Sequence, residues 1–405
     1  MAGRVAPGTH ARRVARRLEA RGLPGLGEAL VRLEGHELGG RWRVAGLYAV
    51  GAEGAVYDVI DLQDAGSAPC VVKIPLVPYH RPAELSSILL RHRRASLRTE
   101  ASYLARSGTS WMPEIRGLHD FLNPLLDARR GGAFTEPEAA LVMERLPGMD
   151  VDLWLARVHR SGIPAPMLQR QLDGLTSDLL LALHALEERG FIYADLRPGN
   201  LRVSGRPLRR LKLLDAGSLV AIGDSSGRFP HVPHYLPPDL YKQHDATGAP
   251  MVPTAAVQAM MAGRALFEVA TGRVPVPGRP IDMDVLRHGG VSPYVADLIE
   301  GLASGSFSDV RHATRFLERQ SARHPVIVPG PARAAPVPAA AATPPVVSPV
   351  VSPVVRAAPA DAAPAPAASP KHAAKPRTKW SRFVDVLAWI AGRPRRAPRK
   401  GTGLS

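Results

Sequence analysis

The chain has 405 residues, a single cysteine and a net charge of +16 at pH 7. The length allows two or three domains with a sizeable core, and one cysteine excludes both an intramolecular disulfide framework and a multi-cysteine metal site. No run of about 18 apolar residues predicts a membrane-spanning helix, and the basic N-terminus lacks the apolar segment typical of a secretory signal. We therefore expect a cytoplasmic protein.

The positive charge is concentrated toward the C-terminus. Residues 325–405 hold twelve Lys and Arg against two Asp, a net of +10, which leaves only +6 for the first 324 residues. A nucleic-acid-binding domain usually carries its basic residues on a folded face. We therefore expect no specific nucleic-acid binding by the folded part, and anionic partners only for the tail.

The first half of the sequence predicts mainly strands after a short leader. Residues 1–40 show a helical pattern interrupted by Pro24, and we expect this leader to pack loosely on the segment after it. Residues 41–62 predict two strands joined by a Gly-containing turn, and residues 68–76 a third, which together make an antiparallel meander. A helical pattern then covers residues 86–108, and a further apolar run covers residues 139–146.

Helices dominate the second half. Residues 172–190 form a strong amphipathic pattern that ends at Gly190, a typical C-terminal stop. Two short strands are predicted at 200–205 and 211–217, and later helices at 256–272 and 292–305. A β-rich half followed by a helical half predicts an α+β fold.

The tail has two parts. Residues 325–377 are rich in Pro and Ala and predict an extended, disordered linker. In residues 378–405, Trp380, Phe383 and Leu387 share one helical face ahead of a basic cluster. This segment is either a disordered extension or an amphipathic helix at the periphery of an anionic membrane or on an acidic partner.

One short stretch suggests catalytic chemistry. In FIYADLRPGNL, residues 191–201, Asp195 and Asn200 stand five residues apart around a Pro-Gly turn. A surface loop explains this spacing equally well when it is taken alone, because Asp, Asn, Pro and Gly all favour turns. The neighbouring motifs decide between the two interpretations.

These motifs come one after another in a specific order. A Gly-rich hairpin (GAEGAVY, residues 51–57) precedes Lys73, which lies inside an apolar strand where an unpaired ammonium is costly. Glu100 comes next in a helix, and Asp215 lies in LLDAG, fifteen residues beyond Asn200. This order resembles that of the eukaryotic-type protein kinases, particularly the bacterial Ser/Thr members, over residues 41–320. The resemblance implies a two-lobed fold, with a small β-rich lobe at 41–146 and a larger helical lobe at 147–324.

The resemblance also implies ATP and Mg²⁺ as cofactors. The Gly-rich hairpin would approach the phosphates, Lys73 would bridge Glu100 to the phosphates, and a hinge after the apolar run would hold the adenine and ribose. Met143 would stand beside the adenine, while backbone groups of the next residues bond its edge. The expected nucleotide-binding residues are Gly51, Gly54, Val56, Lys73, Glu100, Met143, Glu144, Leu146 and Asp150.

The expected catalytic residues lie around the Pro-Gly turn. By resemblance, Asp195 would orient the attacking hydroxyl and accept its proton, and Arg197 would offset charge near the γ-phosphate. Asn200 and Asp215 would bind Mg²⁺, since carboxylate and amide oxygens are hard ligands.

Several positions depart from the family pattern. Ala49 replaces the first glycine, Tyr193-Ala194 the usual His-Arg, and Ala216 the usual Phe of the metal motif. Loss of the Arg predicts that no phosphorylated activation loop docks there. The remaining changes are Arg202 for an apolar residue beneath the adenine, Val232 for a Thr that bonds the catalytic Asp, Asp239 for a Glu, and Gln258 for an Asp that anchors the catalytic loop.

Three functions are open on the sequence. The first is a Ser/Thr protein kinase that transfers the γ-phosphate of ATP to a protein substrate. The second is a pseudokinase or scaffold that binds nucleotide or partners without turnover, and the third is a small-molecule kinase on the same fold. Retention of Lys73, Glu100, Asp195, Asn200 and Asp215 favours the first.

Overall fold

The computed structural model describes nine segments of the chain. They are residues 30–51, 54–64, 66–76, 83–123, 137–161, 165–205, 210–224, 229–289 and 291–323. The chain divides into two units, residues 1–328 and 329–405, and every described residue belongs to the first. Most of the expected leader, the linker at 325–377 and the basic segment at 378–405 lie outside the described residues. Among the helices that are described, none combines the length and the apolar character needed to span a membrane.

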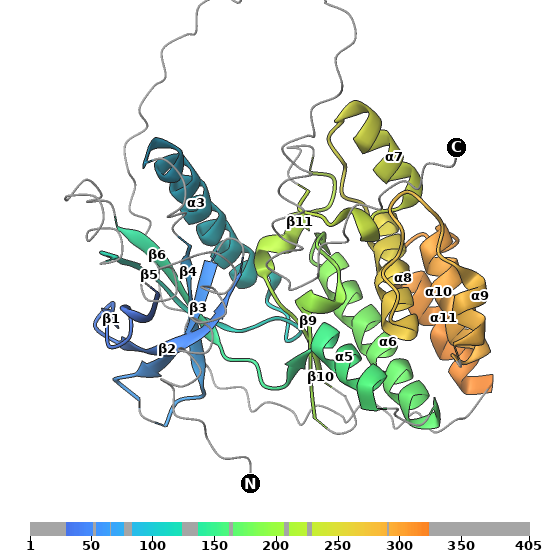
Figure 1. Cartoon of the computed structure of the whole chain (residues 1–405), viewed down its shortest axis with the longest axis horizontal. Helices are drawn as coiled ribbons and strands as arrows, with labels where there is room; N and C mark the ends of the chain where they lie inside the picture. Colours follow the sequence, from blue (N-terminus) through green and yellow to red (C-terminus); the bar gives the residue numbers. More distant parts are fainter. Residues whose placement is uncertain are drawn as a thin grey trace, which may run out of the picture. The chain divides into compact units, whose positions relative to one another are not determined.

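A six-stranded antiparallel sheet dominates the first part of the unit (Figure 1). Its order β1-β2-β3-β4-β6-β5 confirms the expected meander of β2, β3 and β4. The strand β5 was not predicted, because its residues alternate between half-buried and exposed positions at the edge of the sheet. The strands are β1 Glu37–Leu38, β2 Trp42–Val50, β3 Gly54–Asp61, β4 Cys70–Pro75, β5 Ile115–Phe121 and β6 Glu138–Glu144.

The end of the expected leader is part of the core of this sheet. Leu30 and Leu33 are buried together with Trp42 and Tyr57, and the Tyr57 hydroxyl donates to the backbone oxygen of Leu30 at 3.2 Å. The last residues of the leader therefore pack tightly against the sheet, whereas the sequence predicted a loose contact. Burial of large apolar side chains of this kind contributes about 1.5–3 kcal/mol each.

Helix α3, Ala83–Ser107, packs against β4, β5 and β6 (Figure 1). Its buried Leu97, Ala101 and Leu104 repeat at helical spacing, so one face enters the core. The buried guanidinium of Arg94 is paired with Glu138 on β6. These contacts fix the rotation of α3 and thereby the direction in which Glu100, on the same face, points.

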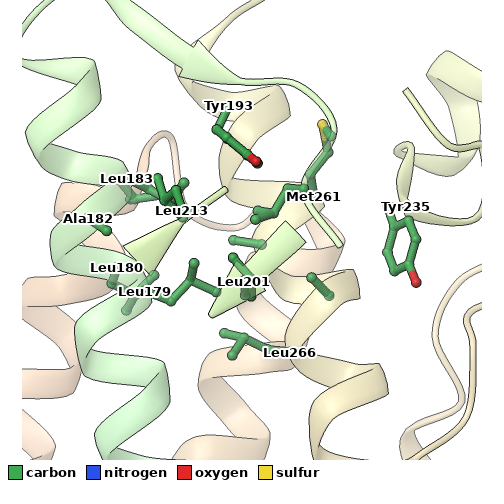
Figure 2. Close-up of a cluster of buried hydrophobic side chains, with 14 of the residues drawn as sticks. Leu179, Leu180, Ala182, Leu183, Tyr193, Leu201, Leu213, Tyr235, Met261 and Leu266 are labelled. Atoms are coloured by element: carbon green, nitrogen blue, oxygen red, sulfur yellow. The ribbon is translucent and has the colours of Figure 1, made fainter. Parts of the chain in front are cut away.

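The second part of the unit is helical. The long helix α8 is buried over most of its length and packs against α6, α10 and α11. Figure 2 shows the apolar cluster in which Leu179 and Leu183 of α6 meet Met261 and Leu266 of α8, with Leu201 and Leu213 beside them. The helices are α5 Val151–Ser161, α6 Ala165–Glu187, α7 Pro238–Thr247, α8 Ala255–Thr271, α9 Met283–His288, α10 Pro293–Ser304 and α11 Val310–Arg323.

Two small sheets lie against these helices. One has the order β10-β9-β7 and the other pairs β11 with β8. The expected strands at 200–205 and 211–217 correspond to β9 and β10, although β10 begins and ends earlier. The strands are β7 Met149–Asp150, β8 Phe191–Tyr193, β9 Leu201–Ser204, β10 Arg210–Leu213 and β11 Leu219–Ala221, and the 3-10 turns between them are η1 Pro198–Asn200, η2 Ala216–Ser218 and η3 Pro233–Tyr235. The fold is α+β, as predicted.

Candidate active site

The structure brings Lys73, Glu100 and Asp215 together. Nζ of Lys73, on β4, lies 2.7 Å from Oε2 of Glu100 on α3 and 2.9 Å from Oδ1 of Asp215. The Lys73 side chain is only 19% exposed. The ammonium inside this strand is therefore paired, as its burial requires.

The charges in this cluster perturb one another. Burial alone would lower the pKa of Lys73, but the nearby charges of Asp215 and Glu100 raise it above its usual value, so the ammonium stays protonated. Burial raises the pKa of Glu100 to about 7, although Lys73 opposes the shift. Burial would also raise the pKa of Asp215, but the charge and the hydrogen bond of Lys73 outweigh burial, so the pKa of Asp215 is lowered. When both carboxylates are ionised, the three groups together carry one net negative charge, which would favour a cation beside them.

Asp195 and Asn200 form a hydrogen-bonded turn at η1. Nδ2 of Asn200 donates to the backbone oxygen of Asp195 at 2.9 Å and to its Oδ2 at 2.8 Å. Nε of Arg197 donates to the same Oδ2 at 3.3 Å. Within the described residues, the buried Oδ1 of Asp195 has no hydrogen-bond partner. Burial raises the pKa of Asp195, while Arg197 and Asn200 oppose the rise. One acceptor oxygen of this carboxylate is therefore available to a ligand.

Asp215 has an unusual backbone conformation. Its φ of 49° makes it the one non-glycine residue in the described segments with positive φ, a conformation that costs on the order of 1–3 kcal/mol. The next turn, η2, contains Gly217, where an added Cβ would lie 3.1 Å from Oδ1 of Asp215. Leu214 N donates to Asn200 O at 2.8 Å and so ties the two acidic segments together.

The Gly-rich hairpin lies next to Lys73. Gly51 N donates to Gly54 O at 2.8 Å across residues 52–53, which are outside the described segments. A Cβ at Gly54 would lie 3.1 Å from the backbone oxygen of Ile74 and 3.5 Å from Cε of Lys73. Val56 is the cross-strand partner of Lys73. The structure therefore places the expected phosphate-binding hairpin beside the lysine.

The expected hinge begins at the end of β6. Glu144 N donates to Glu114 O at 2.8 Å, and the Glu144 carboxylate accepts from Lys212 at 3.2 Å. Met143 is half-buried at the end of the strand, and Leu146 is buried. Among the described residues, the backbone N–H and C=O of Leu146 have no hydrogen-bond partner. The expected ribose-binding residue Asp150, in contrast, is already paired with Arg202 at 2.7 Å.

The residues near the turn that depart from the kinase pattern, Tyr193, Ala194 and Ala216, are well packed. Tyr193 is fully buried, and its hydroxyl donates to the backbone oxygen of Leu214. Ala194 and Ala216 are buried in the same core, and Ala194 N donates to Ser218 O at 2.8 Å. In Figure 2 the Tyr193 ring lies at the edge of the apolar cluster formed by α6 and α8.

The segment around Asp239, residues 231–241, is held by a residue that the sequence analysis did not single out. Asp239 is 98% exposed and contacts only Lys242, at 3.6 Å, among its described neighbours. Instead, the buried Arg264 of α8 donates to the backbone oxygens of His234, Val276 and Arg279. An arginine within the largely apolar run of α8 was the signal that sequence reasoning overlooked.

The donors near Asp215 suit a hard cation. Nδ2 of Asn200 donates to Asp195, so Oδ1 on the other side of the same amide would be the oxygen that joins the Asp215 carboxylate as a ligand. No group of three or more His, Cys, Asp or Glu in the described segments is arranged to hold a metal ion. Mg²⁺ commonly takes one or two protein carboxylates and completes its coordination with water and phosphate, so the two oxygens fit a nucleotide-bound Mg²⁺.

Comparison with known proteins supports a protein kinase class. The Ser/Thr protein kinase PknA of Mycobacterium tuberculosis is 26% identical over 326 residues, which cover 75% of this chain and 67% of PknA. PkaA of Streptomyces coelicolor is 32% identical over a match that covers 34% of this chain and 24% of PkaA. The Arabidopsis thaliana Ser/Thr protein kinase RUNKEL is 27% identical over a match that covers 42% of this chain and 12% of RUNKEL. No protein-family model matches the chain. These similarities support a divergent protein kinase-like family for the chain.

Proposed function

We propose that the chain is an ATP-dependent Ser/Thr protein kinase with the two-lobed kinase architecture. The observation that carries the proposal is the bonding of Lys73 to Glu100 and Asp215 at 2.7 and 2.9 Å. This cluster stands next to the Asp195–Asn200 turn, to which Leu214 N is bonded through Asn200 O. The small lobe comprises residues 41–146, with the six-stranded sheet and α3, and the large lobe residues 147–324.

The nucleotide is held between the hairpin and the hinge. Gly51 and Gly54 allow the backbone to approach the phosphates, and Lys73 donates to them while Glu100 holds the ammonium in place. The backbone groups of Leu146 and the carbonyl of Glu144 bond the edge of the adenine beside Met143. Val56, opposite Lys73 on the neighbouring strand, covers the base.

The Mg²⁺ of the nucleotide is held by Asp215 and by Oδ1 of Asn200. When bound, the ion neutralises charge on the phosphates during transfer. The strained backbone of Asp215 directs its carboxylate toward Lys73. Such strain at a ligand-binding residue is typical of a functional site.

Asp195 is the proton acceptor. Its Oδ2 is held by Asn200 and Arg197, which leaves the buried Oδ1 for the hydroxyl of a substrate Ser or Thr. The hydroxyl oxygen forms a bond to the γ-phosphorus, the bond to the leaving ADP oxygen breaks, and the hydroxyl proton passes to Asp195. The Arg197 guanidinium, 41% exposed, offsets the developing negative charge.

Transfer of labelled γ-phosphate from Mg·ATP tests the proposal. The wild type and Asp195→Ala are compared with Asp239→Ala, a matched change at an exposed aspartate, on autophosphorylation and on a basic acceptor protein. We expect label in the wild type and Asp239→Ala but not in Asp195→Ala, with all three stabilised by nucleotide in a thermal shift. Transfer by Asp195→Ala at the wild-type rate contradicts the assigned role.

The basic segment at 378–405 is proposed to contact an anionic surface, which would place a cytoplasmic kinase at the periphery of the membrane. Its basic residues and its aromatic face support this. Sedimentation of the full chain with anionic vesicles, compared with a chain ending at residue 377, tests it. Equal pelleting of the two proteins contradicts a membrane contact and leaves an acidic protein as the partner to be tested.

A further inference from the structure

The Arg202 side chain joins three segments around the proposed nucleotide site. It projects from β9, where Arg202 is the cross-strand partner of Asp150 on β7. Nη1 lies 2.7 Å from Oδ1 of Asp150, and Nη2 lies 2.7 Å from the hydroxyl oxygen of Tyr48 on β2. The guanidinium therefore connects the six-stranded sheet to the three-stranded sheet.

Four hydrogen bonds hold the guanidinium in this position. Besides Asp150 and Tyr48, Nε donates to Pro147 O at 3.2 Å and Nη2 to Gly148 O at 3.0 Å. The Arg202 side chain is 14% exposed. Charge-assisted bonds of this kind are stronger than neutral ones, so the side chain is a fixed part of the structure.

Tyr48 is held from its other side. The guanidinium of Arg145 lies over the Tyr48 ring, with its Cζ 4.9 Å from the ring centroid. Nε of Arg145 is bonded in turn to Asp58 at 2.6 Å. A cation over an aromatic face contributes about 0.5–1 kcal/mol at exposed sites. Both ends of the Tyr48–Arg202 contact are thus supported by neighbouring residues.

This contact and a bound base compete for the same space. In the proposed site, the base lies between the β2–β3 hairpin, which carries Tyr48 and Val56, and the strand that carries Arg202. A planar ring needs roughly 3.5 Å to the group on each face, or roughly 7 Å between the two groups. The Tyr48 oxygen and the Arg202 nitrogen are 2.7 Å apart, so a base cannot lie between them until they separate.

We propose that Tyr48, Arg202 and Asp150 form a latch that closes the nucleotide site. This inference rests on the proposed function. Nucleotide enters only after the Tyr48–Arg202 bond breaks, and the movement of Arg202 also frees Asp150 to accept a ribose hydroxyl. The apparent affinity is then the intrinsic affinity multiplied by the fraction of molecules with an open latch.

The test compares the wild type with Tyr48→Phe and Arg202→Leu. Tyr48→Phe removes one hydroxyl and keeps the ring under Arg145, whereas Arg202→Leu removes the cation and supplies an apolar floor. Tyr103→Phe is a matched control, because the half-buried Tyr103 meets the Phe191 ring edge-on, with the ring centroids 5.4 Å apart, and is not part of the latch. Arg287→Leu is the second control, because Arg287 is 57% exposed on α9 and bonds Glu300 at 3.0 Å, so it removes a cation outside the proposed site.

Binding of a fluorescent ATP analogue with Mg²⁺ is measured by titration and by stopped flow. A latch predicts that Tyr48→Phe tightens binding roughly tenfold, the scale of one hydrogen bond to a charged group. Because the bound state is unchanged in Tyr48→Phe, the gain lies in the association rate constant and not in dissociation. Arg202→Leu also binds more tightly than the wild type, and both controls bind as the wild type does.

Equal affinities and association rates in all five proteins overturn the latch and leave the proposed function intact. Weaker binding by Tyr48→Phe or by a folded Arg202→Leu also overturns it, because the contact would then belong to the binding-competent state. Absence of binding in every protein contradicts both the latch and the proposed function.

Discussion

Oε1 of Gln258 lies 2.6 Å from the backbone nitrogen of Tyr193 and accepts its hydrogen bond. Nε2 of the same amide donates to Oε1 of Glu187 at 2.8 Å. Gln258 is completely buried, so one side chain joins α8, α6 and the strand that precedes the proposed catalytic turn. A carboxylate could accept from Tyr193 but could not donate to Glu187, which explains why a neutral amide serves here.

Gln258→Ala is expected to destabilise the folded unit by about 1–3 kcal/mol, because the buried Tyr193 N–H is left without an acceptor. For a unit of this size the change lowers Tm by several degrees. Calorimetry or thermal unfolding measures it. Gln243→Ala, an exposed glutamine on α7, is the control and should leave Tm within about a degree of the wild type. Equal stability of the two variants would contradict the anchoring role.

Glu187 makes stability depend on pH. Burial raises the pKa of Glu187 to about 7 from its ordinary 4.5, although the bond from Gln258 opposes the shift. In this window the folded state keeps a proton that the unfolded state has released, so the free energy of unfolding falls as pH rises from 4.5 toward 7. We expect a loss on the order of 1–2 kcal/mol, reduced from the full shift by partial exposure.

Urea unfolding of the wild type at about pH 5 and at about pH 7.5 measures this loss of stability, because the two conditions span most of the range between the ordinary and the raised pKa of Glu187. Glu187→Gln, which keeps the shape of the side chain without its charge, should reduce the difference, and Glu100, whose pKa burial raises in the same way, accounts for slope that remains. Glu188→Gln, at a largely exposed neighbouring position, should retain the whole difference. A slope of the same size in Glu187→Gln as in the wild type would assign the pH dependence to other groups.

Asp215→Asn is expected to fold normally and to lose the effect of Mg²⁺ on nucleotide binding. Asn tolerates positive φ as well as Asp does, so the strained backbone is preserved. The variant lacks the carboxylate that would bind the ion and that now pairs with Lys73. Titration of ADP with Mg²⁺ and with EDTA should give equal affinities in the variant and different ones in the wild type and in Asp239→Asn. A Mg²⁺ effect that survives in Asp215→Asn places the metal elsewhere.

Gly148→Ala is expected to be strongly destabilising. Gly148 has a φ of 95°, and an added Cβ would lie 2.0 Å from the backbone oxygen of Val203. Gly40→Ala is the matched control, since Gly40 also has positive φ, 66°, but its Cβ would meet no atom within 4 Å. Backbone strain alone costs about 1 kcal/mol or more, so the difference between the two variants measures the steric clash at the strand that carries Arg202. Similar unfolding midpoints would show that the Gly148 backbone can shift.

Much of the fold is determined by patterns that are local in the chain. The meander of β2, β3 and β4 and the helices α3, α6, α8 and α10 were predicted because side-chain periodicity reports which face of a single element is buried. The turn that carries Asp195 and Asn200 is equally local, since a Pro-Gly pair and an Asx side chain suffice to close it. The strand β5 was missed, because an edge strand with one half-exposed face has no continuous apolar run.

The pairing of distant groups was decided only by the tertiary structure. The order of motifs suggested that Lys73 meets Glu100, but the contact of Lys73 with Asp215, 142 residues away, depends on how α3 and η2 pack. For Arg202 the resemblance implied only the replacement of an apolar residue beneath the adenine, whereas the folded chain offers its guanidinium two carbonyls, a carboxylate and a hydroxyl. The sequence by itself determined which chemical groups are present and the local elements that carry them. Which groups become partners depends on the packing of elements far apart in the chain, because a buried polar group bonds whichever partner the fold places within reach.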